Sequence, residues 1–250
     1  MPRLVLAIIL GLASSQIGIV CTTVYLHRSI SHKAVTFSKP IQLIFRFLIW
    51  ITTGIKPREW AAVHRRHHAF TDVEGDPHSP LLLGLWRVEL TNAYLYRRCA
   101  RDGVTVEKYA RDLPPDKFDK RVFDHPYVGL AVGIAILCLI LGWQYGLLAS
   151  LVHVTSYIFL NGAVNSFAHV YGKKHYDNTA RNLQWLAFLV AGEGLHNNHH
   201  AAPTSARLSH RRGEKDPGWW VISLLVRMKQ AKIRLEEPKF IKASAGATAP

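Results

Sequence analysis

Cysteine is scarce in this sequence, and its three residues follow no pattern typical of thiol chemistry. Cys21, Cys99 and Cys138 stand far apart without a CxxC pair, and Cys21 and Cys138 lie in apolar runs. This spacing excludes a disulfide framework and a thiolate site for zinc or an iron–sulfur cluster. We interpret the three thiols as small buried residues. The sequence also lacks a haem-binding motif and a repeat of solenoid length.

Acidic residues are also few: the 250 residues include 17 Asp and Glu against 31 Lys and Arg, a net charge of +14. Such an excess suits either a nucleic-acid-binding surface or the cytoplasmic face of a membrane protein. Nucleic-acid-binding motifs are missing, whereas long apolar runs are present. The composition therefore predicts an integral membrane protein, and it predicts no nucleic acid partner.

The first apolar run extends from Leu4 to Leu26. As a helix it would be about 34 Å long, enough for a hydrocarbon core of roughly 30 Å. It continues to His27 without a cleavage site, which favours a membrane span over residues 4–26 rather than a signal peptide. The run Ile41–Gly54 is shorter and contains Arg46, so we expect an interfacial or re-entrant segment at 41–54.

Two further apolar runs, Tyr127–Gly142 and Gly146–Val164, are separated by Trp143, Gln144 and Tyr145. They predict a hairpin of spans over 127–142 and 146–168, with aromatic residues at an interfacial turn. Lys and Arg gather between the first and second of these three spans and again after the third. Both regions should therefore be cytoplasmic. The small residues at 243–250 predict a disordered tail.

Histidine is the unexpected abundance, with 14 residues. Most of them fall in three clusters next to predicted spans, all on the same predicted side of the membrane, so folding can bring them together. The clusters are His27 with His32; His64, His67 and His68; and His196, His199 and His200.

The spacing within two of the clusters suits metal ligation from a helix. His64 shares a helical face with His67 or His68, because residues three or four apart are neighbours on a helix surface. The adjacent pair His67 and His68 diverges by about 100°. One member can therefore face one metal ion and its neighbour a second. His27 and His32 are five residues apart, and we expect them to straddle a frayed end of the first span.

Eight clustered histidines exceed the needs of a single tetrahedral zinc ion, and a two-metal site accounts for the number better. Imidazole suits iron, zinc, copper and nickel. A single HxxHH has even odds of being a chance basic cluster, but three clusters on one side of the membrane make coincidence a poor explanation. A membrane transporter or sensor would place ligands at mid-depth in the spans, where His153 is the candidate.

The clusters and their surroundings resemble the membrane fatty acyl desaturase family, in particular its Δ9 acyl-CoA members. The resemblance covers about residues 4–210. It includes Glu59-Trp60 before the second cluster, Asp76-Pro-His-Ser-Pro80 after it, Gly192-Glu-Gly-Leu195 before the third, and Asn165-Ser-Phe-Ala-His169. It implies an all-α integral membrane protein, with residues 1–242 as one domain. In this domain transmembrane helices are capped by a cytoplasmic helical domain that holds two iron ions.

The resemblance also implies the ligand set. The expected iron ligands are His27, His32, His64, His67, His68, His169, His196, His199 and His200, with Asn165 reaching an iron through water. The residues alone leave His169 open between a ligand and an interhelical hydrogen-bond donor. The family usually has four spans, so with about three this chain looks one span short. A partner helix or the packing of 41–54 would then cover the exposed face.

The implied reaction is O2-dependent insertion of a double bond into a fatty acyl chain held in an apolar tunnel. The carrier is open between coenzyme A, acyl carrier protein and a membrane lipid, and Ala62-Val63 stands where acyl-CoA-using relatives can carry charge. Electrons would come from a separate cytochrome b5, ferredoxin or rubredoxin-type donor with its reductase. Spacing leaves hydroxylation, acetylenation and decarboxylation open. A bacterial inner membrane and an endoplasmic reticulum suit the sequence equally.

Residues near the clusters have expected roles as well, and for the four acids two roles are open. Asp72, Glu74, Asp76 and Glu193 could orient ligand imidazoles or pair with Arg. Asn161 and Gly162 could line the tunnel. His153 is expected to pack against another helix and His78 to lie beside the ligands, whereas the remaining histidines are expected at the surface or interface: His125, His175 and His210.

Overall fold

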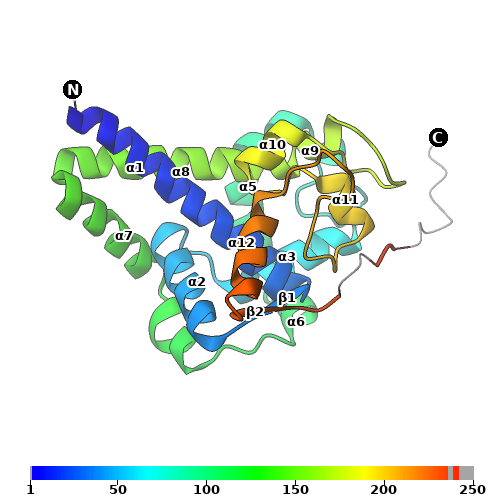
Figure 1. Ribbon diagram of the computed structural model, residues 1–250, viewed down its shortest axis with the longest axis horizontal. Coiled ribbons are helices and arrows are strands. Elements are labelled where there is room, and N and C mark those ends of the chain that lie inside the picture. Colours follow the sequence, from blue (N-terminus) through cyan, green and yellow to red (C-terminus); the bar gives the residue numbers. More distant parts are fainter. Residues whose placement is uncertain (1, 236–238, 242–250) are drawn as a thin grey trace.

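The computed structural model describes residues 2–235 and 239–241, and the tail expected at 243–250 lies outside this range. The described chain is mostly helical (Figure 1). Its elements are α1 (Pro2–Cys21), η1 (Thr22–Ser31), β1 (Val35–Phe37), α2 (Lys39–Thr52), α3 (Pro57–Ala69), α4 (Pro80–Leu83), α5 (Leu85–Ala100), α6 (Gly103–Ala110), η2 (Asp119–Phe123), α7 (Pro126–Leu141), α8 (Trp143–Asn165), α9 (Phe167–Val170), α10 (Gln184–Leu189), α11 (His196–Ala201), α12 (Pro217–Arg227) and β2 (Ala231–Ile233).

The long apolar helices gather at one end of the molecule, where α1 packs along α8 and α7 folds back on α8 (Figure 1). Within the described residues, two helical stretches are long and apolar enough to cross a membrane, Pro2–Ser31 and Trp143–Val170. They coincide with the first and last expected spans. Helix α7 has 16 residues, about 24 Å, which is short for a span. Many large apolar side chains on these helices are exposed, as lipid-facing residues would be.

The turn between α7 and α8 differs from the sequence expectation. Helix α7 ends at Leu141 and α8 already begins at Trp143, so Gly142 alone separates them. Gly142 has φ of 81°, a left-handed conformation that glycine adopts without a steric penalty. Trp143, Gln144 and Tyr145 therefore form the first turn of α8, because the helix start follows the glycine and not the change in polarity.

The prediction that the first span ends in a frayed helix between His27 and His32 is wrong. The helix continues past α1 as the π-helix η1, from Thr22 to Ser31, and the N–H of His32 donates to the carbonyl of His27 over 3.1 Å. A bond from residue i+5 to residue i defines the wider π turn. A five-residue spacing, which would separate two side chains on an α-helix, corresponds here to about one turn.

Helix α2 covers most of the segment expected at 41–54. One side is buried through Phe45, Ile49 and Trp50, and α2 packs against α1 and α7. The other side exposes Leu43, Ile44 and Phe47. A short helix that is apolar on both sides and joins the long helices covers part of their surface, while its outer side remains suited to a lipid interface.

The last described helix and strand contact the elements that surround the first histidine cluster. Strand β2 pairs antiparallel with β1, with Val35 opposite Ile233 and Phe37 opposite Ala231. Helix α12, which precedes β2, packs against η1. Its Ile222 belongs to the same buried cluster as Val24 and Leu26. Helix α12 thus buries one side against η1, while Trp220 and Leu224 on it are exposed.

Candidate metal centre

Helix α3 carries the second histidine cluster. It starts at Pro57. Proline is favoured at the first helical position because its fixed φ suits the helix, and because an N–H at that position would have no partner within the helix. His64 and His68 are four residues apart and share a face, whereas His67 is rotated by about 100° from His68. One helix therefore presents imidazoles in two directions.

Helix α11 repeats this arrangement in the third cluster. His196 and His200 lie on one side with their Nε2 atoms 3.1 Å apart, and His199 points elsewhere. The intervening Asn197 and Asn198 are buried and hold this short helix in place. The Asn197 amide donates to the carbonyls of Tyr176 and Ala180, both at 3.0 Å. The sequence reasoning missed these asparagines, although two amides inside a ligand cluster were a visible signal.

The structure brings the expected histidines together in two adjacent groups. In each group the ring nitrogens lie within 4.8 Å of one another. The five-histidine group consists of His27, His32, His64, His68 and His199, and the four-histidine group consists of His67, His169, His196 and His200. Both neighbouring pairs are divided between the groups: His67 from His68, and His199 from His200.

Ring nitrogens face one another across each group. In the five-histidine group the Nε2 atoms of His32 and His64 are 2.8 Å apart, and those of His68 and His199 are also 2.8 Å apart. His27 Nε2 lies 3.0 Å from His199 Nε2. In the four-histidine group the Nε2 of His169 is buried and has no hydrogen-bond partner among the described residues. Converging imidazole nitrogens are the donor arrangement of a metal site.

Three carboxylates bind the opposite side of the rings. Asp72 Oδ2 lies 2.8 Å from Nδ1 of His169, Asp76 Oδ2 lies 3.0 Å from Nδ1 of His67, and Glu193 Oε1 lies 2.8 Å from Nδ1 of His27. Each of these acids therefore orients an imidazole. This was one of the two roles expected from the sequence, and pairing with Arg was the other. A carboxylate on Nδ1 fixes the proton there and directs the Nε2 lone pair inward. The fourth acid considered, Glu74, is exposed.

The charges of the site follow from burial. Burial and the neighbouring imidazoles lower the pKa of six histidines, which are His32, His64, His68, His196, His199 and His200. These rings are therefore neutral, the form that binds metals. Burial opposes ionisation of Asp76, but its hydrogen bond with His67 holds the pKa of this carboxyl below its usual range. The centre thus combines neutral rings with ionised acids.

Asn165 is the last residue of α8 and faces α5. Its amide nitrogen donates to Oδ1 of Asn92 on α5 over 3.0 Å. Both asparagines line a cavity of about 770 Å³ that runs along the centre. The same cavity is lined by His27 and His64 of the five-histidine group and by His196 of the four-histidine group. A molecule in this cavity would contact both groups.

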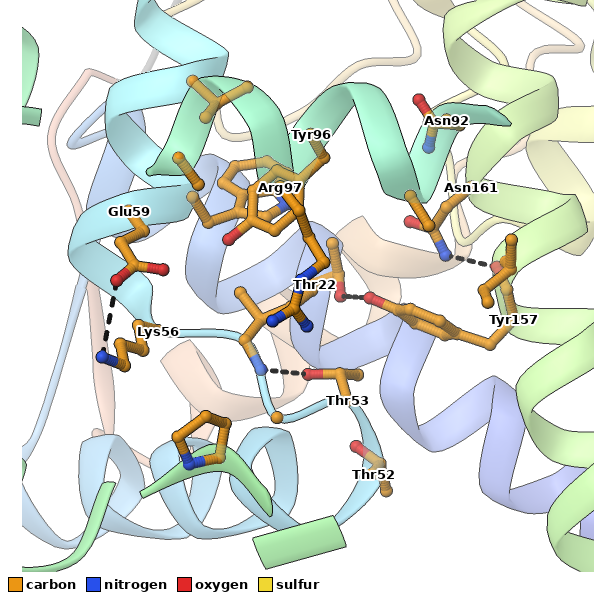
Figure 2. A pocket seen from close by; sticks show the side chains of 18 of the residues that line it. Thr22, Thr52, Thr53, Lys56, Glu59, Asn92, Tyr96, Arg97, Tyr157 and Asn161 are labelled. Carbon is orange, nitrogen blue, oxygen red and sulfur yellow. Dashed lines mark hydrogen bonds and ion pairs between the residues drawn. The ribbon is translucent and has the colours of Figure 1, made fainter. Parts of the chain in front are cut away.

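Figure 2 shows the part of this cavity between α3, α5 and α8. The Thr22 hydroxyl pairs with the Tyr157 hydroxyl over 2.8 Å, and Asn161 donates to the Tyr157 carbonyl. Asn161 lines the cavity as expected. The neighbouring Gly162 instead faces Glu89 of α5.

The cavity also reaches the surface. Its lining includes Arg97, Arg101, His125 and Tyr127, all of which are exposed, and these four residues are called the cavity mouth below. Arg97 donates to the Tyr127 hydroxyl over 2.9 Å. The mouth therefore carries positive charge.

The remaining histidines differ in their surroundings. His153 packs against α2, where its Nε2 donates to the Thr52 carbonyl over 2.6 Å, which confirms its expected interhelical contact. His78 is buried and stacks on His67 at 4.7 Å between ring centroids. His125 is exposed, whereas His175 and His210 are half-buried.

The fold and the site define a helical protein with long apolar helices at one end. Two convergent histidine groups adjoin a cavity that residues of α7 and α8 also line. Comparison with known families matches residues 2–213 to the fatty acid desaturase model. The chain therefore belongs to the fatty acid desaturase family, and its activity is that of an oxidoreductase that desaturates fatty acyl chains.

Several characterised relatives are similar over most of the chain. Delta-9 acyl-lipid desaturase 2 of Arabidopsis thaliana is 32% identical over 219 residues, which cover 82% of this chain and 67% of the relative. The sn-1 stearoyl-lipid 9-desaturase of Synechocystis sp. is 32% identical over 91% of this chain and 70% of its own. The sn-2 palmitoyl-lipid 9-desaturase of Nostoc sp. is 31% identical over 85% and 75%, respectively.

Proposed function

We propose that each histidine group binds one iron ion and that the protein desaturates an acyl chain lying in the adjacent cavity. The observation that carries this proposal is the division of His67 from His68 and of His199 from His200 between two groups. A single metal ion would leave one member of each pair unused. Two ions a short distance apart account for all nine expected histidines.

The donor set fits iron. Imidazole nitrogens are suitable ligands for iron, and the rings of His199 and His200 are neutral and buried. The unpartnered Nε2 of His169 is satisfied if it is a ligand. Asn165, which is outside both groups and lines the cavity, would act on an iron through a bridging water.

Desaturation removes one hydrogen from each of two neighbouring methylenes. With two electrons and two protons from a donor, O2 is reduced to two waters while the C–C single bond becomes a double bond. Bound iron supplies the oxidising power that no side chain has. The protein residues hold the chain in the cavity so that one C–C bond lies beside His27, His64 and His196.

The substrate is proposed to be an acyl chain of a membrane lipid, desaturated at the Δ9 position, because the characterised relatives are named for acyl-lipid and stearoyl-lipid 9-desaturation. Arg97 and Arg101 at the cavity mouth suit a phosphate group on the carrier. Coenzyme A and acyl carrier protein also carry phosphate, so supplying purified lipid or acyl-CoA to the enzyme separates these carriers.

The protein is proposed to cross the membrane several times with its histidines on the cytoplasmic side, where the basic loops lie. Electrons would come from a separate acidic carrier, of the cytochrome b5, ferredoxin or rubredoxin type, that docks on the basic surface.

The test combines metal analysis with product analysis. Purified protein should contain two irons per chain, and an expressing host should gain acyl chains lighter by two hydrogens. His68→Ala should lower the iron content and abolish the product, whereas His175→Ala should change neither, since His175 belongs to neither group. Wild-type protein without iron would contradict the proposal. An acyl product heavier by one oxygen would show that the protein hydroxylates the chain instead of desaturating it.

A further inference from the structure

Arg28 is the largest fully buried side chain in the described structure, with 1% of its surface exposed. It follows His27 in η1, and its guanidinium lies at Asp216, the residue that precedes α12. Its Nη1 and Nη2 donate to the two carboxylate oxygens of Asp216 over 3.0 and 2.8 Å. Nη1 also donates to the Ala206 carbonyl, and Nη2 to the Ala191 carbonyl. The paired geometry suits the planar fork of arginine and not the single ammonium of lysine.

The surroundings of Arg28 form a fitted socket. A Cβ on Gly192, which has φ of 104°, would lie 2.1 Å from Asp216 Oδ1 and 2.6 Å from Arg28 Nη2. A Cβ on Gly218 would lie 2.8 Å from the same nitrogen. Asp216 also accepts from the backbone N–H groups of Leu208 and Trp219. The socket therefore has space for a guanidinium and for no additional atom at these two positions.

The socket is connected to the metal centre through Glu193. This carboxylate binds Nδ1 of His27, accepts a hydrogen bond from the Thr23 hydroxyl and lies 3.8 Å from Nε of Arg28. Because His27 and Arg28 are adjacent in η1 and both lie next to Glu193, clamping the Arg28 side chain would restrict the position of His27. Asp216 balances the charge of Arg28, which leaves the Glu193 carboxylate for His27.

We propose that Asp216 is a positioning residue of the metal centre: by clamping Arg28 it sets the geometry of the five-histidine group through His27 and Glu193. The inference rests on the proposed metal-binding function. It assigns a role in the centre to the segment that begins α12, although the match to the family model ends at residue 213. On this view α12 and β2 are part of the machinery that holds the ligands, because α12 packs against η1, which carries His27, and β2 pairs with β1, the strand that follows His32.

The test measures binding of Co2+ to metal-free purified protein, since the visible absorption of Co2+ reports ligand number and geometry. Asp216→Asn removes the charge but keeps the shape. The matched control is Asp116→Asn, because Asp116 forms a similar paired contact with Arg46, at 2.8 and 2.9 Å, away from the histidines. Arg28→Lys keeps the charge in the socket and removes the fork. Circular dichroism and thermal unfolding establish that each variant is folded.

Wild-type protein and Asp116→Asn are expected to bind two Co2+ ions per chain with the same spectrum. In Asp216→Asn and Arg28→Lys, one of the two ions should bind about 10- to 100-fold more weakly. This is the usual effect of removing a residue that supports a metal ligand without binding the metal itself. Its absorption should change even at temperatures where the fold is intact. A change in spectrum distinguishes positioning from a general loss of stability, which alters the folded fraction but not the spectrum of folded protein.

A folded Asp216→Asn protein with wild-type Co2+ affinity and spectrum overturns the inference. If Asp216→Asn does not accumulate in folded form, Arg28→Lys decides: an altered spectrum supports the inference and an unaltered one overturns it. Wild-type protein that binds no Co2+ would instead contradict the proposed function. The two failures are therefore distinguishable.

Discussion

The two histidine groups are built with different degrees of enclosure. All four members of the four-histidine group are buried, and Asp72 and Asp76 each bind the outer nitrogen of one of its rings. In the five-histidine group three members are half-buried, and Glu193 orients one ring. The more open group compensates with one additional histidine and with the Arg28 socket. The two groups thus differ in how their rings are held: two acids bind rings of the enclosed group, and one acid binds a ring of the more open group.

The largest expected effect is the loss of a ligand from either group. His67→Ala should remove metal from the four-histidine group and His199→Ala from the five-histidine group, because each deletes a nitrogen that faces its neighbours. Both should reduce product below detection while membrane insertion stays normal. Iron content and lipid profiles measure the two effects. Full activity in both variants would refute the two-metal proposal.

The next largest effect should come from the acids of the enclosed group. Asp76→Asn keeps the shape of the side chain but removes the charge that holds His67. Metal affinity of the four-histidine group should fall about 10- to 100-fold, with the other group unchanged. Titration with Co2+ measures both sites in one experiment. Glu74→Gln is the control, since Glu74 is an exposed acid two residues away. Equal weakening of both groups would contradict their independence.

A smaller effect is expected at the cavity mouth, which belongs to neither group. Arg97→Ala and Arg101→Ala remove positive charge from the lining without touching a histidine. KM for a phosphate-bearing substrate should rise several-fold, because each arginine removed weakens binding by roughly 1 kcal/mol, while iron content and kcat stay near wild type. Arg121→Ala, an exposed arginine outside the cavity lining, serves as control. A drop in iron content would show that the mouth supports the centre itself.

The smallest effect concerns Arg65, which ties α3 to the end of η1 beside the five-histidine group. Arg65 donates to the carbonyls of Ile30 and Ser31 and pairs with Asp112. Burial opposes ionisation of Asp112, but the hydrogen bonds from Arg65 and Lys33, together with the charges of these two residues, lower the pKa of this carboxyl to about 2. The pair is partly exposed, so Asp112→Asn should cost less than about 1 kcal/mol of stability.

Acid should reproduce the effect of Asp112→Asn. A carboxyl whose pKa is lowered by folding contributes stability above its unfolded pKa, and this contribution is lost as the pH falls toward about 2. Thermal unfolding between pH 5 and pH 2 should therefore show a smaller acid loss in Asp112→Asn than in wild type. An identical loss in both proteins would mean that the pair contributes nothing measurable.

Much of the metal site was predictable because its signals are local. Residues His64, His67 and His68 are close in sequence, so helical geometry alone predicted that neighbours would diverge into two sites. The long apolar runs predicted α1 and α8 for the same reason. The acids Asp72, Asp76 and Glu193 could be proposed as partners of the ligands, but the sequence offered Arg as an equal alternative.

The remaining features depend on backbone irregularity and on contacts distant in sequence. The π-helix η1 follows from packing against α3 and α12, so no residue pattern distinguished it from a frayed helix end. The turn at Gly142 follows from one residue's conformational freedom rather than from hydropathy. Arg28 and Asp216 are 188 residues apart, and this basic chain contains many other possible Arg–Asp pairs, so only the folded structure identifies the partners.

The wide separation of the ligands has a consequence for how the protein is made. His27 and His199 face each other across 172 residues, so the five-histidine group cannot close until α11 has been synthesised. Contacts so distant in sequence form late in folding. A nascent chain on the ribosome therefore offers only incomplete clusters to metal ions. If the groups hold iron as proposed, iron loading would be the final step of biogenesis, after the apolar helices have found their positions.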